Sequence, residues 1–264
     1  MSVEGPFHAA RPLLSAHGLT VTIAGHRVCG GLDLVVRPGE CWAILGRNGA
    51  GKTTLLHTLA GLRAADAGSI EILGQPLANL TPRDVACLRG VLPQDDSDVF
   101  PATVLETVLV GRHPHLSRWQ WEGADDIRIA REALVAADME GTEERDVRTL
   151  SGGERRRVAL AALLAQQPRL FLLDEPSSHL DLSHQIGLLD RLVSTVRADG
   201  GALVMVVHDV NLALRYCDQA LLLSAGEALA GPAPALLTAE RLSGLYGVPL
   251  RALAGPRGEV FAPE

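Results

Sequence analysis

The sequence predicts an α/β fold in which a parallel sheet carries a phosphate-binding loop, and three observations lead to this prediction. The chain has 264 residues, 47% of them hydrophobic, which suits one large domain or two small ones without stabilising disulfides or metals. A short apolar segment, residues 41–45, runs directly into a glycine-rich loop. A second apolar segment, residues 169–173, ends in Asp174 and Glu175. Open α/β sheets bind ligands at the carboxyl ends of their strands, so both segments indicate one site.

The glycine-rich loop follows the pattern GxxxxGK[ST] from Gly46 to Thr53. Of the 24 basic residues in the chain only Lys52 is a lysine, and it occupies the lysine position of this pattern. A compact ammonium reaches phosphate oxygens inside a tight loop, where a broad guanidinium would displace the backbone. A helix expected at residues 52–62 adds its N-terminus to this anion site, and Thr53 can bind magnesium. The predicted ATP-binding residues of the loop are Gly46, Arg47, Asn48, Gly49, Ala50, Gly51, Lys52, Thr53 and Thr54.

The carboxylates that end the second apolar segment are candidates for metal binding and catalysis. Asp174 is expected to hold a magnesium ion, and Glu175 is expected to polarise the water that attacks the γ-phosphate. Two acidic residues after a strand are also common in turns. The pair therefore indicates this chemistry only in combination with the loop at residues 46–53.

A third motif, Leu150-Ser-Gly-Gly-Glu-Arg155, lies between these two segments and predicts the start of a helix that extends to about Gln166. Ser151 and Glu154 have the S-x-x-E spacing of a capping box. The two glycines between them leave the helix N-terminus without side chains, and such an N-terminus attracts anions. An ordinary helix cap would not require two adjacent glycines.

This third motif resembles the LSGGQ signature of the ATP-binding cassette ATPases, and the resemblance extends from about Leu13 to Leu253. It implies a P-loop NTPase fold with a RecA-like parallel-sheet core, an N-terminal antiparallel β-subdomain and an inserted helical subdomain. It also implies that two copies pair head to tail, so that the signature of one copy binds the ATP held by the other. The signature residues are Ser151, Gly152, Gly153 and Glu154.

The same resemblance implies roles for residues outside the three motifs. Gln94 corresponds to the Q-loop glutamine, which reaches the magnesium ion and the attacking water. His208 corresponds to the switch histidine that contacts the γ-phosphate, and Asp181 to the aspartate of the D-loop. The predicted catalytic residues are Glu175, His208 and Gln94, and the predicted magnesium ligands are Thr53, Gln94 and Asp174.

Four positions depart from the family pattern. Ile23 stands where an aromatic residue that stacks on adenine is expected, and the base site is assigned to Ile23 and Val28. Glu154 replaces the signature glutamine, Ser177 replaces a threonine and Ala162 replaces an arginine. These last three departures remove no catalytic group.

Secondary-structure patterns divide the chain into a lead-in, one ATPase domain and a tail. Residues 1–12 are expected to be a disordered lead-in, residues 13–253 the ATPase domain, and residues 254–264 a C-terminal tail. The helical subdomain is expected at about residues 99–166. A β-rich region is expected at residues 13–45 and 69–73, and the parallel sheet is expected to contain strands near Cys41, Arg89, Arg169, Ala202 and Gln219.

Charge and hydropathy restrict the partners of the chain. The formal net charge is −7, which disfavours a sequence-independent grip on nucleic acid. The apolar stretches fall short of the ~18 residues needed to cross a bilayer. The N-terminus lacks the basic start and apolar run of a signal peptide, so the chain is expected to stay in the cytoplasm.

Several short motifs resemble the cassettes of importers for cobalamin, haem and ferric siderophores. They are Leu92-Pro-Gln94, Phe100-Pro101, Gly111-Arg-His-Pro-His115, Ser178-His-Leu-Asp-Leu182 and Leu245-Tyr-Gly-Val248. The resemblance implies an ATPase that uses ATP and Mg²⁺ at the cytoplasmic face of the inner membrane. Its implied partners are a second copy of itself, polytopic permease subunits and, indirectly, a substrate-binding protein.

Two readings of the function follow. The first is the importer subunit, for which overall resemblance favours cobalamin slightly as the cargo. The alternative is a soluble cassette ATPase that acts on nucleic acid or protein complexes. Such proteins usually carry two cassettes, zinc modules, coiled-coil arms or basic surfaces, whereas this sequence has one cassette and a net negative charge.

Overall fold

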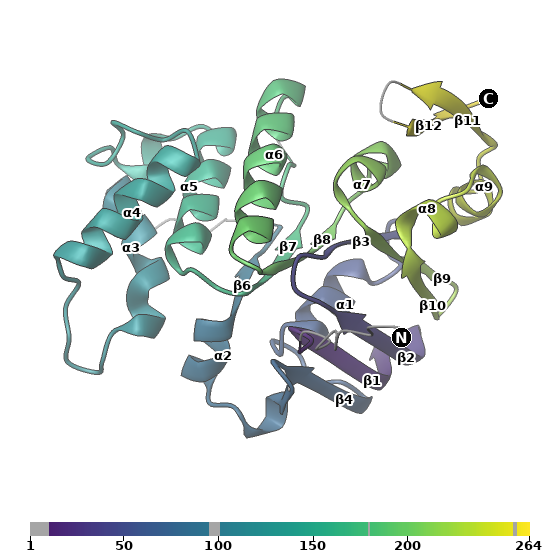
Figure 1. The fold of residues 1–264 in the computed structure, drawn as a ribbon, viewed down its shortest axis with the longest axis horizontal. Coiled ribbons are helices and arrows are strands. Elements are labelled where there is room, and N and C mark those ends of the chain that lie inside the picture. Colours follow the sequence, from purple (N-terminus) through teal and green to yellow (C-terminus); the bar gives the residue numbers. More distant parts are fainter. Residues whose placement is uncertain (1–10, 95–100, 179, 256–257) are drawn as a thin grey trace, which may run out of the picture.

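The computed structural model describes residues 11–94, 101–178, 180–255 and 258–264. Most of the expected lead-in at residues 1–12, the expected start of the helical subdomain at residue 99, and the motif residues Phe100 and His179 lie outside the described residues. Figure 1 shows a helical lobe at one end, a central sheet with helices, and a smaller sheet beneath it. Within the described residues, no helix has the length and apolarity that a membrane span requires.

A six-stranded sheet with the strand order β10-β9-β3-β8-β7-β6 forms the centre of the molecule. Five neighbouring strands run parallel, and β10 pairs antiparallel with β9 at one edge. The strands are β3 (Cys41–Gly46), β6 (Arg89–Leu92), β7 (Leu170–Asp174), β8 (Ala202–Val206), β9 (Gln219–Ser224) and β10 (Glu227–Pro232). The predicted parallel-sheet core is confirmed. The edge strand β10 was not predicted, because its alanines, glycine and proline are depleted in strands.

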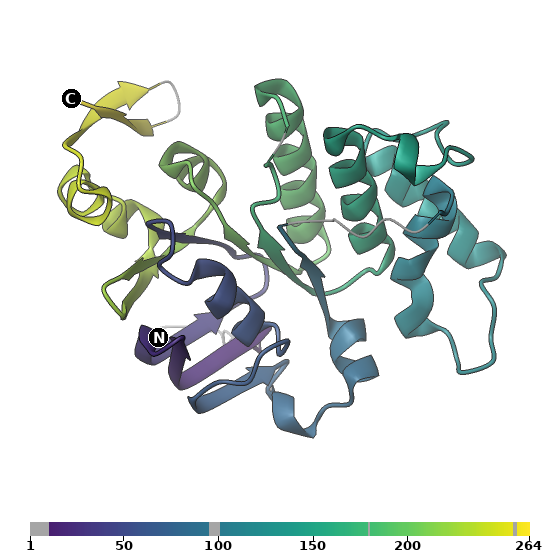
Figure 2. The same ribbon diagram turned by 180° about the vertical axis from the view of Figure 1, so that it is seen from behind.

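The central sheet separates two hydrophobic cores, and successive residues of its strands face opposite sides. In β3, Ala43 and Leu45 pack into one core, while Trp42 and Ile44 pack into the other. The first core also contains side chains of α6 (Leu182–Ala198) and α7 (Val210–Tyr216). The second contains those of α1 (Lys52–Leu59), which lies between the central sheet and the smaller sheet (Figure 2).

The smaller sheet is antiparallel, has the order β2-β1-β4-β5, and matches the expected N-terminal β-subdomain. It consists of β1 (Leu14–Ile23), β2 (His26–Val36), β4 (Ala67–Ile72) and β5 (Gln75–Pro76). A short 3₁₀ helix, η1 (Leu77–Asn79), and helix α2 (Pro82–Leu88) lead from it back to the central sheet.

The helical lobe is inserted between β6 and β7 and has a hydrophobic core of its own. Its elements are α3 (Val104–Leu109), η2 (Val110–His115), α4 (Ala124–Ala136), η3 (Val147–Thr149) and α5 (Gly152–Ala165). Helix α5, which begins at the signature motif, is the last of these elements, and the chain continues from it directly into β7.

The C-terminal part continues the domain beyond the boundary expected at residue 253. Helices α8 (Ala233–Leu236) and α9 (Ala239–Tyr246) precede a hairpin of β11 (Leu250–Gly255) and β12 (Gly258–Pro263). The expected boundary therefore falls inside β11. Phe261 of β12 is buried, and the side chain of Asn211 on α7 bonds to its backbone N and O at 2.8 and 3.1 Å. These contacts hold the end of the chain against α7.

Candidate active site

The loop between β3 and α1 is shaped by glycines at positions where a larger residue would not fit. Gly51 precedes α1 with a φ of 89°, and a Cβ there would lie 2.5 Å from Cγ2 of Val28. A Cβ on Gly46 would lie 2.8 Å from the carbonyl oxygen of Leu223. No side-chain hydrogen bond caps α1, so the N–H groups of its first turn are available to an anion.

Lys52 is the first residue of α1 and is only 7% exposed. Its Nζ donates hydrogen bonds to the carbonyl oxygens of Gly46 at 3.0 Å and Arg47 at 3.2 Å. Burial lowers the pKa of this ammonium, whereas the nearby carboxylates of Glu175 and Asp174 act in the opposite direction. The cation therefore folds back over its own loop, within electrostatic reach of both carboxylates.

Asp174 ends β7 and is fully buried. Among the described residues, neither oxygen of its carboxylate has a hydrogen-bond partner. Burying a charged group without partners is costly, so these oxygens suit a ligand that supplies positive charge. Carboxylate oxygens are also the donors that magnesium prefers, which fits the predicted metal site.

Glu175 has a strained backbone, and its side chain points at His208, the predicted switch histidine. Its φ of 48° lies in the left-handed region, which non-glycine residues rarely occupy. Its Oε1 lies 2.5 Å from Nε2 of His208, which follows β8. The structure thus brings Lys52, Asp174, Glu175 and His208 together where β3, β7 and β8 end.

Ile23 and Val28, the two residues predicted to bind the base, differ in how much of each residue is exposed. Ile23 ends β1 and is 45% exposed. Val28 is only 3% exposed, because it packs against Gly51 of the loop. Of the two, Ile23 is therefore the residue with side-chain surface available to a base.

The signature motif caps α5 as its spacing predicts. The Oγ of Ser151 accepts a hydrogen bond from the N–H of Glu154 at 3.2 Å, and Oε2 of Glu154 accepts one from the N–H of Ser151 at 2.8 Å. Arg145 donates to Oε1 of Glu154 at 2.7 Å, and these bonds hold the pKa of that carboxyl at about 2. A Cβ on exposed Gly152 would meet nothing within 4 Å. Among the described residues, no hydrogen bond or ion pair joins this motif to the loop at residues 46–54.

Asp181 of the predicted D-loop caps α6. Its Oδ1 accepts hydrogen bonds from the N–H of His184 at 2.9 Å and the hydroxyl of Ser183 at 2.9 Å, and lies 2.8 Å from Nδ1 of His184. The bonds from His184 and Ser183 lower the pKa of Asp181 to about 2. Asp181 therefore stabilises the start of α6.

Residues 29–178 match the family described as ABC transporter. The chain belongs to this family. Over 253 residues it is 43% identical to the hemin import ATP-binding protein HmuV of Gloeobacter violaceus, which covers 93% of this chain and 91% of the relative. The cassette is accordingly an ATPase of the ABC type, and it binds ATP.

Solved structures agree with this assignment. A transporter described as being of metal-chelate type, in an inward-facing conformation, has a TM-score of 0.84 and 28% identity, covering 96% of the cassette and 98% of that chain. The dimeric structure of MJ0796, a bacterial ABC transporter cassette, has a TM-score of 0.73 and 26% identity, covering 83% of this chain and 98% of the other.

The importance of Arg156 was not predicted from the sequence, and this residue links α5 to the segments that follow β6 and end β7. This residue is 4% exposed, and its guanidinium donates hydrogen bonds to backbone carbonyls around β7 and after β6. One of them is the carbonyl of Gln94, the exposed Q-loop residue, at 3.5 Å. A signal was available, because Arg156 precedes the core residues Leu160 and Leu163 by four and seven positions. The helical period therefore directs this arginine toward the core.

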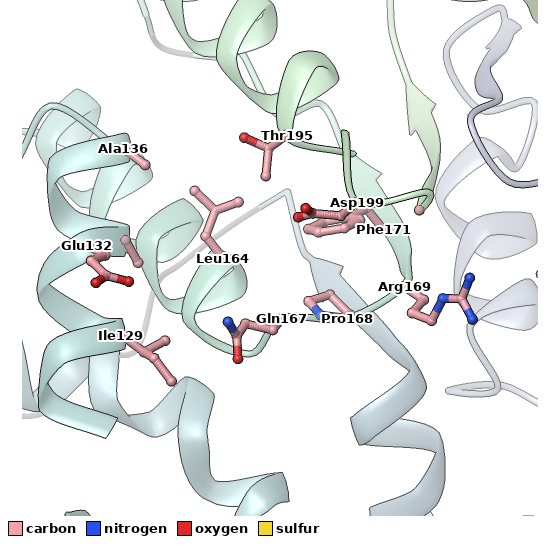
Figure 3. A pocket seen from close by; sticks show the side chains of 12 residues that line it. Ile129, Glu132, Ala136, Leu164, Gln167, Pro168, Arg169, Phe171, Thr195 and Asp199 are labelled. Carbon is pink, nitrogen blue, oxygen red and sulfur yellow. The ribbon is translucent and has the colours of Figure 1, made fainter. Parts of the chain in front are cut away.

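A separate cavity of about 420 Å³ lies between the helical lobe and the start of β7 (Figure 3). Glu132 and Leu164 line it from the lobe, and Phe171, Thr195 and Asp199 line it from the core. It is at the opposite end of β7 from Asp174, and none of the predicted site residues line it.

Proposed function

We propose that this cassette is the ATP-hydrolysing, energy-coupling subunit of a membrane importer for haem. The observation that carries the proposal is the cluster in which Lys52, Asp174 and the Glu175–His208 pair meet at the ends of parallel strands. The relative named for hemin import supports haem as the cargo. The slight preference for cobalamin has no support among the relatives described above.

The catalytic assignments follow from this cluster. Lys52 and the uncapped N–H groups of α1 would bind the phosphates of ATP. Glu175 would accept a hydrogen bond from the attacking water and draw off its proton. His208 would hold the Glu175 carboxylate through Nε2 and contact the γ-phosphate.

A magnesium ion would complete the site. Thr53, Gln94 and Asp174 would hold it, and the buried, partnerless oxygens of Asp174 support this assignment. When bound, the ion supplies charge neutralisation for the phosphate oxygens.

A second copy of the chain would supply the other half of each nucleotide site. Among the described residues, no hydrogen bond or ion pair joins the signature motif, residues 151–154, to the loop of its own chain, and the exposed N-terminus of the motif suits an anion. A head-to-tail pair would place it on the partner's ATP with closed twofold symmetry. The dimeric form of the similar MJ0796 cassette supports this arrangement.

The remaining partners belong to the transport system. We propose that the dimer docks on polytopic permease subunits at the cytoplasmic face of the inner membrane, and that a substrate-binding protein delivers the haem. The import function in the name of the HmuV relative supports this placement.

The Glu175→Gln variant tests the catalytic proposal. It should retain ATP affinity within about twofold, lose at least about 100-fold in turnover, and accumulate as an ATP-bound dimer, because the base is removed but the phosphate contacts remain. Phosphate release and sedimentation velocity measure these effects. Glu132→Gln is the matched control, since this carboxylate is remote from the cluster. Near-wild-type turnover in Glu175→Gln would refute the assigned base.

The cargo requires a separate experiment. A tagged cassette is extracted from its native membrane in detergent, and the copurified permease is placed in proteoliposomes. Binding protein loaded with haem should stimulate ATP hydrolysis, whereas protein loaded with cobalamin or a ferric siderophore should not. Stimulation by cobalamin alone would contradict haem, and recovery of nucleic acid without a permease would favour the soluble alternative.

A further inference from the structure

The guanidinium of Arg156 is almost completely enclosed by backbone carbonyl groups. An arginine side chain has five N–H donors in a fixed planar arrangement, one on Nε and two on each Nη. In Arg156, Nε has one carbonyl acceptor, and Nη1 and Nη2 have two each. Every N–H donor therefore has a carbonyl oxygen within hydrogen-bond distance. The acceptors are the carbonyl oxygens of Pro93 (2.5 Å), Asp174 (2.7 Å), Glu175 (2.9 Å), Pro176 (3.3 Å) and Gln94 (3.5 Å).

These acceptors belong to two chain segments that both carry predicted catalytic residues. Pro93 and Gln94 follow β6, and residues 174–176 end β7. Arg156 itself lies on α5, five positions after Ser151. The side chain of Arg156 therefore joins the signature helix to the segment that contains Glu175 and to the segment that contains Gln94.

The bond to Glu175 has a special consequence because the backbone of that residue is strained. A left-handed φ at a non-glycine residue is unfavourable and persists only where neighbouring groups fix it. The carbonyl of Glu175 is fixed by Arg156 at 2.9 Å and by the N–H and hydroxyl of Ser178 at 3.1 and 2.9 Å. Arg156 also holds the preceding carbonyl, that of Asp174, so it fixes the two peptide groups that flank the Cα atom of Glu175.

We propose that Arg156 is a positioning residue for ATP hydrolysis, which holds Glu175 and the Gln94 segment in register with the signature helix. The inference rests on the proposed catalytic role of Glu175. Because the five bonds cross from the helical lobe to the core, a displacement of α5 is transmitted to the carboxylate through a single buried group. The lobe that presents the signature thereby also sets the geometry of the base in its own chain.

Substitution of Arg156 tests this proposal, and Arg128 on α4 of the same lobe provides the control, because its exposed guanidinium pairs with Asp125 and Glu132. Arg156→Gln keeps at most two N–H donors, whereas Arg156→Lys keeps the charge and at most three. We expect Arg156→Gln to lower kcat by about 10- to 100-fold while the Kd for a fluorescent ATP analogue stays within about twofold. Arg156→Lys should be intermediate, and Arg128→Gln should match the wild type. The unfolding temperature of each variant is measured in parallel.

The outcomes separate positioning from a general structural role. Equal kcat in Arg156→Gln and Arg128→Gln would overturn the inference, and so would a loss of affinity as large as the loss of kcat. If Arg156→Gln fails to fold, Arg156→Lys decides, because wild-type kcat in that variant contradicts the proposal and a lowered kcat at unchanged affinity supports it. Full turnover in Glu175→Gln would instead remove the proposed base, together with the role of Arg156 in holding it.

Discussion

Helices α1 and α5 both begin at glycine-rich segments, but their N-termini are built in opposite ways. At α1 the preceding Gly51 is left-handed, no side chain caps the helix, and the buried cation of Lys52 lies at its first residue. At α5 the N–H groups are served by a complete capping box of Ser151 and Glu154, and the N-terminus is exposed. The N-terminus of α1 is therefore suited to bind an anion as it stands, whereas the N-terminus of α5 is already capped and is exposed.

This difference indicates that the two helix N-termini have different roles in nucleotide binding. An uncapped helix with a buried lysine gains its missing partners when phosphate binds, so one chain suffices to hold ATP. A capped and exposed helix end gains little from phosphate alone and acts only when another surface delivers the nucleotide. We therefore expect the α1 end to control ATP affinity and the α5 end to control assembly of the dimer.

Removal of the cation at α1 should have the largest effect. We expect Lys52→Ala to lower ATP affinity by at least about 100-fold, or ~3 kcal/mol, because the charge-assisted bonds to phosphate are lost. Titration with a fluorescent ATP analogue measures the change. Retained affinity would mean that the loop N–H groups alone hold the phosphates.

Alanine substitution at one glycine of each end gives a matched comparison. Gly51→Ala should destabilise the fold by about 1–3 kcal/mol and abolish ATP binding, because φ is 89° and the new Cβ would meet Val28 at 2.5 Å. Gly152→Ala should change stability by less than about 1 kcal/mol and leave ATP affinity unaltered, because its Cβ enters open space. Urea unfolding and nucleotide titration compare the two variants, and equal losses would remove the distinction between the ends.

The smallest effect is expected at Ile23, which occupies the predicted base position. An aromatic ring stacked on a base contributes ~1–3 kcal/mol in single-stranded nucleic acid binding, and a branched aliphatic side chain supplies part of this. Because Ile23 is 45% exposed, a larger ring has room. Ile23→Tyr should tighten ATP binding several-fold and raise the preference for ATP over GTP. Strongly ATP-selective wild-type binding that tyrosine does not improve would show that the base binds elsewhere.

The two ends also differ in how far the sequence could predict them. The capping box was predictable because Ser151 and Glu154 are three positions apart, and the loop was predictable because its strand, glycines and lysine are contiguous. The helical period places Arg156 toward the core, but its role was not predictable, because its acceptors lie 18 to 63 positions away and only the fold brings them close. The packing of Val28 on Gly51 also depends on residues far apart in the sequence, and so does the attachment of β12 to α7 through Asn211 and Phe261.

The central claim is that each working site combines the α1 end of one chain with the α5 end of another. Mixing two inactive variants tests it most directly. Lys52→Ala keeps an intact α5 end, and Gly152→Asp keeps an intact α1 end while placing a carboxylate where the partner's phosphate would bind. Aspartate is accepted in the first turn of a helix, so this variant should fold.

Each variant alone should hydrolyse ATP at no more than a few per cent of the wild-type rate. In an equimolar mixture about half of the dimers are mixed, and each mixed dimer contains one site with both ends intact. The account therefore predicts recovery of about a quarter of the wild-type rate per chain, measured by phosphate release at saturating ATP. A mixture no more active than its two components, or full activity of Gly152→Asp alone, would contradict the claim.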